Sequence, residues 1–269
     1  MTAVQESTDV APVPSPYRVF GAVLQRDLFV TGRDVWIFLA QVLLQPLFLL
    51  FVFGKVLASI GATQSGYGDL LFPGIVALTA VLTALQATAL PLVLDFSFSR
   101  EIEDRLLAPM PVMWVGIEKI VYAVFRALVA TGVMFPLGRW ILGPLPLHGD
   151  GVLLLVVTIV VGSVLGSALG MTLGTFVPVN RLNILFALVI TPLIFTGCTQ
   201  YPWPLLSSLR WFQVVTLFNP LTYVSESMRA ASVTSVPHMS TWICVPVMLA
   251  CAVLFIALGL VGFRRRALD

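Results

Sequence analysis

Long stretches without any charged residue constrain this chain more than any other feature. Residues 70–94 are uncharged for 25 residues, and residues 35–54 are uncharged for 20. A helix of about 20 apolar residues spans the roughly 30 Å hydrocarbon core of a bilayer. Only 10% of the 269 residues are charged, whereas a soluble domain carries about 25%. The sequence therefore predicts an all-α, multi-pass membrane protein.

The apolar runs predict six transmembrane helices. Their expected ranges are 35–54, 70–94, about 120–142, 151–177, 184 to about 199, and about 242–263. Residues 1–16 contain three prolines and no apolar segment typical of a signal peptide. We therefore expect a disordered tail over 1–16, followed by a single transmembrane domain over 17–269.

An amphipathic segment over residues 17–32 precedes the first predicted span. Its apolar face consists of Tyr17, Phe20, Leu24 and Leu28, and its polar face carries Arg18, Gln25 and Arg26. A helix with these two faces is expected to lie along the membrane interface. The alternative is that the segment is the soluble beginning of the first span.

A densely charged segment, residues 95–119, lies between the second and third spans. It contains five acidic and three basic residues. Such a segment must lie in water or at the membrane edge. Its centre, Ser99 to Leu107, is predicted as a short amphipathic helix with Ser99 as N-cap, and Pro109 ends it. Either this is a solvated loop or it is a docking helix for a soluble partner.

The distribution of basic residues predicts the orientation in the membrane. Ten lysines and arginines fall on the side of the N-terminus, and four fall on the other side. Cytoplasmic loops carry an excess of basic residues. We therefore expect a protein of the plasma membrane with both termini in the cytoplasm. The loop 95–119 should lie on the same side.

Residues 200–230 are too apolar for a solvated loop, yet three prolines and other breaks interrupt them. Interrupted backbone at membrane depth must be buried in protein or line a cavity. We predict one or two short re-entrant or interfacial helices on the outer face. Aromatic residues of this region either line a substrate exit or form an ordinary interfacial belt. They are Tyr201, Trp203, Trp211 and Phe212.

Two features within the spans indicate close packing and a buried charge. Glycine recurs every four residues in the fourth span, at Gly162, Gly166, Gly170 and Gly174. Such a ridge lets another helix approach closely, either in this chain or in a second subunit. Arg126 lies inside the third span. It either extends to the interface or pairs with Asp95 or Glu118.

The sequence offers no catalytic set. The two histidines, His148 and His238, fall in separate loops, so a metal site is not indicated. No G-x-S-x-G and no nucleotide-binding G-x-x-x-x-G-K-[ST] occurs, and no carboxylate lies near a span centre. We expect no catalytic, cofactor-binding or metal-binding residue on this chain. Uphill transport would require energy from a separate protein.

Two segments resemble type-2 ABC exporter permeases. SREIEDRLLAPMPVMWVGIEKIV (99–121) is similar to their cytoplasmic loop, although Glu103-Asp104 replaces the usual glycine-threonine. FNPLTYVSESMRA (218–230) is similar to the signature N-P-[LIF]-[TS]-Y-x-x-[DE]-[AS]-[LM]-R before their last span. The daunorubicin-resistance-like branch, which includes drug, lipid and polysaccharide exporters, is the nearest in character.

The resemblance implies a half-transporter. Two copies of identical sequence would pair, and each would dock one ATP-binding cassette subunit that carries ATP and Mg²⁺. Coupling would involve the loop residues Arg100, Glu101, Glu103, Asp104 and Arg105. The signature residues are Asn219, Pro220, Tyr223, Glu226 and Arg229, for which we predict a structural role: Pro220 at the first helical position and a Glu226–Arg229 pair.

The expected function is outward transport of a hydrophobic or amphipathic substrate, such as a drug, a lipid or a lipid-linked glycan. A polysaccharide or teichoic-type glycan exporter is the alternative. An intramembrane lipid-modifying enzyme and a passive channel or secondary carrier are weaker hypotheses, because each needs polar residues that are missing. Every face of these helices is apolar, so the periodicity does not identify residues that line a translocation path.

Overall fold

The computed structural model describes residues 15–63, 66–96, 111–145, 149–178, 182–233 and 236–268. These residues form helices and connecting turns, with no strand among them. Five helical segments are long and apolar enough to cross a membrane. They are α2 (Val35–Phe51) continued through η1 (Val52–Val56) and α3 (Leu57–Ser59), then α4 (Tyr67–Leu94), α6 (Val112–Leu142), α7 (Val152–Phe176) with η3 (Gly149–Gly151) before it, and α11 (Thr241–Leu268).

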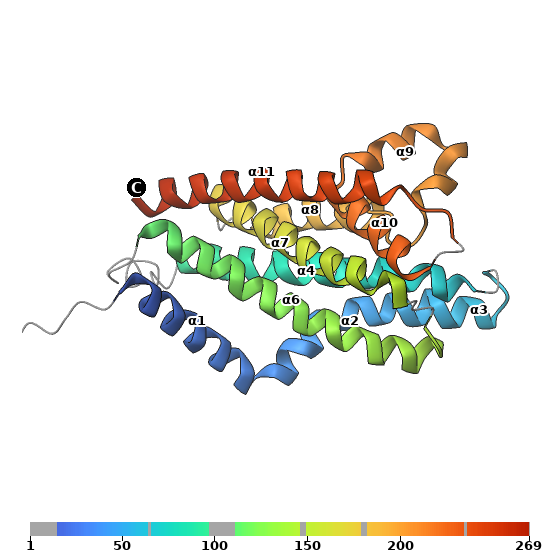
Figure 1. Ribbon diagram of the computed structural model, residues 1–269, viewed down its shortest axis with the longest axis horizontal. Coiled ribbons are helices and arrows are strands. Elements are labelled where there is room, and N and C mark those ends of the chain that lie inside the picture. Colours follow the sequence, from blue (N-terminus) through green and yellow to red (C-terminus); the bar gives the residue numbers. More distant parts are fainter. Residues whose placement is uncertain are drawn as a thin grey trace, which may run out of the picture.

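Helix α4 is the core of the bundle. Every residue from 71 to 85 is buried, and apolar residues lie on all sides of this helix. It contacts α2, α6, α7 and the short helix α10 (Pro220–Ser232). Figure 1 shows it passing through the centre of the bundle, between α6 and α7. An all-round apolar helix is expected at such a buried position.

The glycine ridge of α7 lies against α4 of the same chain. A Cβ atom at Gly166 would lie 2.2 Å from the Val81 carbonyl oxygen, and one at Gly170 would lie 2.4 Å from that of Leu85. The Thr88 and Ser167 hydroxyls form a 2.7 Å hydrogen bond across the same contact. The neighbour of this part of the ridge is therefore internal, which answers the question that the sequence left open.

The first described residues of α1 (Pro16–Arg33) and the C-terminal end of α11 lie at the same end of the bundle (Figure 1). We call this end the terminal face. Here the Arg266 guanidinium donates to the carbonyls of Gly174 and Val177, at 3.0 and 3.2 Å. These are carbonyls at the C-terminus of α7, where a cation is favourable. Arg266 thus joins α11 to α7.

Helix α1 is separated from α2 by a bend at Asp34 and lies against the beginning of α6. The rings of Tyr17 and Phe20 contact Trp114, at centroid distances of 5.0 and 5.9 Å. Thr31 and Tyr122 form a hydrogen bond further along the two helices. The predicted apolar face therefore contacts α6, whereas Arg18 is exposed. A position at the membrane interface stays a prediction.

Helix α6 begins earlier than predicted. It starts at Val112 and not near residue 120, so it contains Glu118 and Lys119, both buried. The helix begins directly after its N-cap, Pro111. The Lys119 ammonium lies 3.1 Å from the Asp95 carboxylate, and this ion pair partly neutralises the charge that the helix buries. The predicted helix Ser99–Leu107 and the proposed coupling residues 100–105 lie outside the described residues.

The predicted fifth span is shorter than expected. Helix α8 (Leu182–Thr196) has 15 residues, which corresponds to about 22 Å at 1.5 Å per residue. It ends at Thr196, three residues before the predicted end, because the chain turns at Gly197 and Cys198, the latter with a φ of 51°. The described residues thus give five helices of spanning length and α8 as a shorter apolar helix.

Residues 200–230 form short helices, as the sequence predicted. They are η5 (Trp203–Ser208), α9 (Arg210–Leu217) and α10, three helices where one or two were expected. They gather at the end of the bundle opposite the terminal face, which we call the α9 end (Figure 1). Much of α10 is buried against α4, α7 and α11.

Candidate functional site

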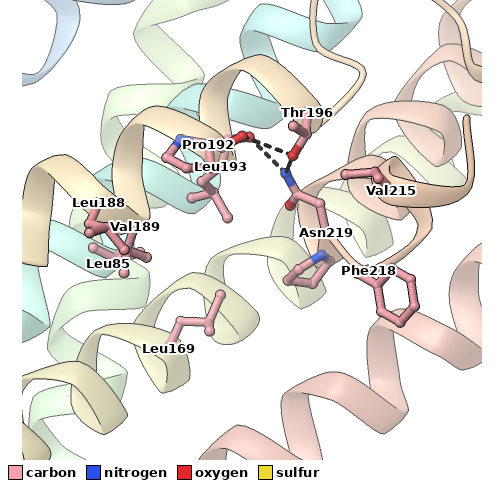
Figure 2. Close-up of a pocket in the computed structure, with 11 residues that line it drawn as sticks. Leu85, Leu169, Leu188, Val189, Pro192, Leu193, Thr196, Val215, Phe218 and Asn219 are labelled. Carbon is pink, nitrogen blue, oxygen red and sulfur yellow. Dashed lines mark hydrogen bonds between the residues drawn. The ribbon is translucent and has the colours of Figure 1, made fainter. Parts of the chain in front are cut away.

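The signature sequence begins helix α10 and at the same time ends helix α8. Asn219 is the N-cap of α10, and its side-chain oxygen accepts a 2.9 Å hydrogen bond from the Leu221 amide. Pro220 occupies the first helical position, where a missing N–H costs nothing. The Asn219 amide nitrogen donates to the Leu193 carbonyl and the Thr196 hydroxyl, both at 2.9 Å (Figure 2).

The last four carbonyls of α8 all have side-chain partners. Such carbonyls lack partners within a helix, and in an apolar environment they must be satisfied elsewhere. The Tyr201 hydroxyl, whose pKa is raised by burial, donates to the Phe195 carbonyl. The acceptors and their partners are Leu193 with Asn219, Ile194 with Thr199, Phe195 with Tyr201, and Thr196 with Thr222.

The same motif also satisfies the end of α9. The Thr222 hydroxyl has one proton, which the Thr216 carbonyl at 2.7 Å shares with the Thr196 carbonyl at 3.2 Å. The Tyr223 hydroxyl donates to the Leu217 carbonyl at 2.9 Å. Thr216 and Leu217 belong to the last turn of α9. Residues 219–223 therefore hold the ends of two helices and the beginning of a third at one point.

A buried ion pair lies two turns further along α10. The Glu226 carboxylate and the Arg229 guanidinium are 2.7 Å apart, and both side chains are fully inaccessible to solvent. Arg229 donates to the carbonyls of Cys198 and Thr199, at 2.5 and 3.0 Å, and its Nε lies 3.4 Å from the carbonyl of Leu70. These bonds fix the turn after α8 to the beginning of α4.

Glu226 makes matching contacts with two further segments. Its Oε1 accepts from the Trp203 amide at 2.9 Å, and its Oε2 accepts from the Met239 amide at 2.8 Å. The ion pair thereby connects α10 with α4, the turn after α8, η5 and the segment before α11. A buried charge needs partners of this kind, since desolvation would otherwise exceed the Coulomb attraction.

The four aromatic residues of the predicted exit region do not point the same way. The Trp203 indole donates to the Gln213 carbonyl, and the Gln213 side chain donates back to Trp203, both at 3.2 Å. Phe212 contacts the rings of Tyr201 and Trp211, at 6.1 and 5.5 Å. Of the four, Trp211 is the exposed one, with 67% of its surface accessible. The others stabilise the arrangement of η5 and α9.

An apolar pocket of about 360 Å³ lies beside this junction, between α8 and the body of the protein (Figure 2). Most of its wall consists of leucine, valine and proline side chains of α4, α7 and α8, and Phe218 and Asn219 stand at one end. None of the described residues that line it is charged. Pockets for small ligands usually measure about 300–1,000 Å³ and are mostly apolar. This pocket can therefore receive an apolar group.

The described residues contain no group of three or more histidine, cysteine or acidic side chains that could hold a metal ion. His148 lies outside the described residues, and His238 lies 3.1 Å from the Met239 carbonyl. Within the described part of the chain, Arg126 forms an ion pair neither with Asp95 nor with Glu118, and the Asp95 carboxylate lies 3.1 Å from the Lys119 ammonium. The predicted pairing of Arg126 with Asp95 is therefore wrong.

Sequence reasoning missed the capping of α8 and α9 by the signature. The available signal was the concentration of hydroxyl and amide side chains in two apolar regions, ITPLIFTGCTQY (190–201) and FNPLTY (218–223). Such side chains are typical partners for free carbonyls at helix ends. The pocket was also missed, since its walls come from several helices that are distant in sequence.

This architecture defines a class: a multi-span helical membrane protein whose last span is preceded by short helices joined through one polar motif. The family model described as ABC-2 type transporter matches residues 18–233, which is most of the chain and covers α1 to α10. The chain belongs to the ABC-2 type transporter family, as the resemblance of residues 99–121 and 218–230 predicted. It is thus a permease component of an ABC transporter, a class that works with an ATP-binding cassette partner. No curated protein matches the chain.

Asn219→Ala is expected to destabilise the protein by about 2 kcal/mol, because α10 loses its N-cap and α8 loses a carbonyl partner. In a thermal unfolding experiment on the purified protein this corresponds to a fall in Tm of roughly 4–8 °C.

Asn219→Asp separates the two contributions, because aspartate is an equally good N-cap but has no N–H to donate. We expect it to be less stable than the wild type, because the Leu193 carbonyl loses its donor while the N-cap of α10 is kept. Wild-type stability of Asn219→Asp would mean that the bond to Leu193 contributes nothing.

Proposed function

We propose that this chain is the transmembrane subunit of an ATP-driven exporter in the plasma membrane. Two identical copies would pair, and each would bind one separate ATP-binding subunit that carries ATP and Mg²⁺. The observation that supports this proposal is the family match over residues 18–233, which includes both the charged loop and the signature. The terminal face, with Arg18, Lys119 and Arg264–Arg266, would face the cytoplasm.

The proposed substrate is hydrophobic or amphipathic, such as a drug, a lipid or a lipid-linked glycan. The pocket between α8 and α10 supports this proposal, because its uncharged wall offers few groups to a strongly polar ligand. The short helices at the α9 end would form the outer exit. A polysaccharide or teichoic-type glycan is the alternative substrate, and the exposed ring of Trp211 favours it as a surface on which a sugar could stack.

Coupling to the ATP-binding subunit would use the loop between α4 and α6. The Asp95–Lys119 ion pair joins the end of α4 to the beginning of α6, so movement of the loop would reach both helices together. Helix α1 contacts the same part of α6 through Trp114. The proposed contacts with the ATP-binding subunit are Arg100, Glu101, Glu103, Asp104 and Arg105.

Reversing two loop charges is expected to weaken binding of the ATP-binding subunit. In the double variant Glu101→Arg/Glu103→Arg, recovery of that subunit with the purified permease should fall roughly tenfold or more, while membrane insertion is unchanged. The control is Asp150→Arg, an exposed acid at the opposite end of the bundle. Equal recovery with both variants would contradict the assigned coupling residues.

The wild-type complex provides the test of the function itself. We expect one ATP-binding subunit per permease after purification in detergent, with an ATPase rate that rises when an apolar substrate is added. A permease that purifies alone, also after co-expression with the ATPases of its genomic neighbourhood, would overturn the exporter proposal.

A further inference from the structure

Arg126 is a cation in the middle of a membrane-spanning helix. It lies 14 residues after the beginning of α6, or about 21 Å along a helix of 31 residues. A charged side chain at such a depth is costly unless a counter-charge or a polar cavity accompanies it, and it commonly marks a functional site.

In the part of the chain that the structure describes, the Arg126 guanidinium contacts two aromatic rings. Its guanidinium carbon lies 4.2 Å from the ring centroid of Phe38 and 5.6 Å from that of Tyr122. Its Nε is buried and has no acceptor among the described residues. The aromatic faces attract the cation, but they supply neither a negative charge nor a hydrogen-bond acceptor for Nε.

Asp95 and Glu118 do not line the two pockets that Arg126 borders. The Asp95 carboxylate is 3.1 Å from the Lys119 ammonium. None of the described residues that line these pockets is acidic. Among the described residues that line the two pockets, Arg126 is the charged one.

The larger of the two pockets measures about 250 Å³ and lies between α2, α4 and α6. Next to Arg126 it presents two side-chain amides, Gln41 and Gln86, and the hydroxyl of Thr83. Amide NH₂ groups and a guanidinium are hydrogen-bond donors, and together they suit an anion with several acceptor oxygens. The rest of the wall is apolar, including Leu90 and Leu94.

A second, wholly apolar groove follows along the same two helices. It measures about 280 Å³ and is lined by α2 and α6 side chains, among them Phe48, Leu137 and Trp140. On α6 it lies 11 to 15 residues beyond Arg126, which is about 16–22 Å along the helix. The hydrogen-bond donors around Arg126 suit an anionic head group, and the apolar groove further along α2 and α6 suits a long apolar tail.

We propose that the pocket beside Arg126 binds the phosphate of a membrane phospholipid. Arg126 would donate to the phosphate oxygens, and Gln41 and Gln86 would complete the donor set, while an acyl chain follows the faces of α2 and α6. This lipid site is distinct from the pocket at the α8–α10 junction, and it does not depend on the exporter proposal.

The test measures lipid retention by the full chain purified in an uncharged detergent. Equal amounts of phosphatidylglycerol and phosphatidylcholine are added, and native mass spectrometry counts the molecules that remain bound. The wild type should retain the anionic lipid preferentially, and Arg126→Gln should lower that retention roughly tenfold. Arg139→Gln is the matched control, since Arg139 is an exposed arginine of the same helix.

A second variant covers the case in which Arg126→Gln folds poorly. Gln86→Leu keeps the cation and removes one donor, and it should lower retention roughly threefold. Unchanged retention in both variants, or equal loss in Arg139→Gln, would overturn the proposal.

The source of the phosphate is tested with inorganic phosphate as competitor. We expect an excess of inorganic phosphate to leave the phospholipid bound, because the tail contributes to binding. Displacement of the lipid would assign the pocket to free phosphate and would overturn the lipid assignment. No arm needs the ATP-binding subunit, so failure here and failure of the exporter proposal are separate results.

Discussion

Replacing Arg229 with methionine is expected to destabilise the protein by about 3–5 kcal/mol, because Glu226 is then left as an uncompensated buried charge. Three carbonyls, those of Leu70, Cys198 and Thr199, would also lose a contact. We expect thermal unfolding of the purified protein to show a fall in Tm of roughly 6–20 °C.

The control for this substitution is Arg210→Met. Arg210 is exposed at the beginning of α9, so the same change in chemistry should alter stability by less than about 0.5 kcal/mol. If Arg229→Met unfolded at the temperature of this control, the ion pair would not hold the α9 end together.

A variant without either charge separates the contribution of the ion pair from that of the other hydrogen bonds that the two side chains make. Glu226→Met/Arg229→Met leaves no buried charge, so it should be less unstable than the sum of the single variants. It should still unfold below the wild type, because the amides of Trp203 and Met239 lose the carboxylate that accepts from them. Additive single and double variants would show that the two side chains act independently.

The sequence predicted the long spans well because their signal is local. An uncharged run such as residues 70–94 is sufficient evidence for a spanning helix, and α4 covers that run. The fifth span was overestimated because hydropathy alone does not show where a helix stops. Helix α8 ends at Thr196, where its carbonyls find partners in Asn219 and Thr222, more than 20 residues later.

The site residues were predicted with mixed success for a similar reason. The spacing of Glu226 and Arg229 on one helix is enough to propose a pair, and the structure places them 2.7 Å apart. For Arg126 the sequence predicted Asp95 as one possible partner, but the Asp95 carboxylate forms its ion pair with Lys119. Which of two cations reaches one acid depends on helix packing, and the sequence of a uniformly apolar bundle contains little information about packing.

For the glycine ridge of α7, too, the sequence predicted a contact but did not identify the helix that makes it. The four-residue spacing predicted a close helix–helix contact, but it could not say which helix approaches. The residues of α4 that meet the ridge also recur every four positions, at Val81, Leu85 and Ala89. The residues between them are apolar as well, so the sequence does not distinguish these three positions. Their role follows from the backbone of α4, whose carbonyl oxygens meet the ridge.

Gly166→Ala is therefore expected to be among the most damaging single changes to this protein. The added Cβ would lie 2.2 Å from the Val81 carbonyl oxygen, and this atom belongs to the backbone of the central helix, which cannot turn aside as a side chain can. Overpacking typically costs about 1–3 kcal/mol and occasionally more, and we expect the upper end, with a fall in Tm of roughly 6–12 °C.

Gly132→Ala is the matched control. Gly132 lies within α6, and a Cβ there would meet nothing within 4 Å, so alanine should be neutral or stabilise the helix by up to about 1 kcal/mol. If Gly166→Ala lowers the stability and Gly132→Ala does not, the loss of stability comes from the α4–α7 contact and not from helix propensity. Wild-type stability of Gly166→Ala would mean that α7 lies further from α4 than the structure shows. The ridge would then be free to face a second subunit, as the sequence alone allowed.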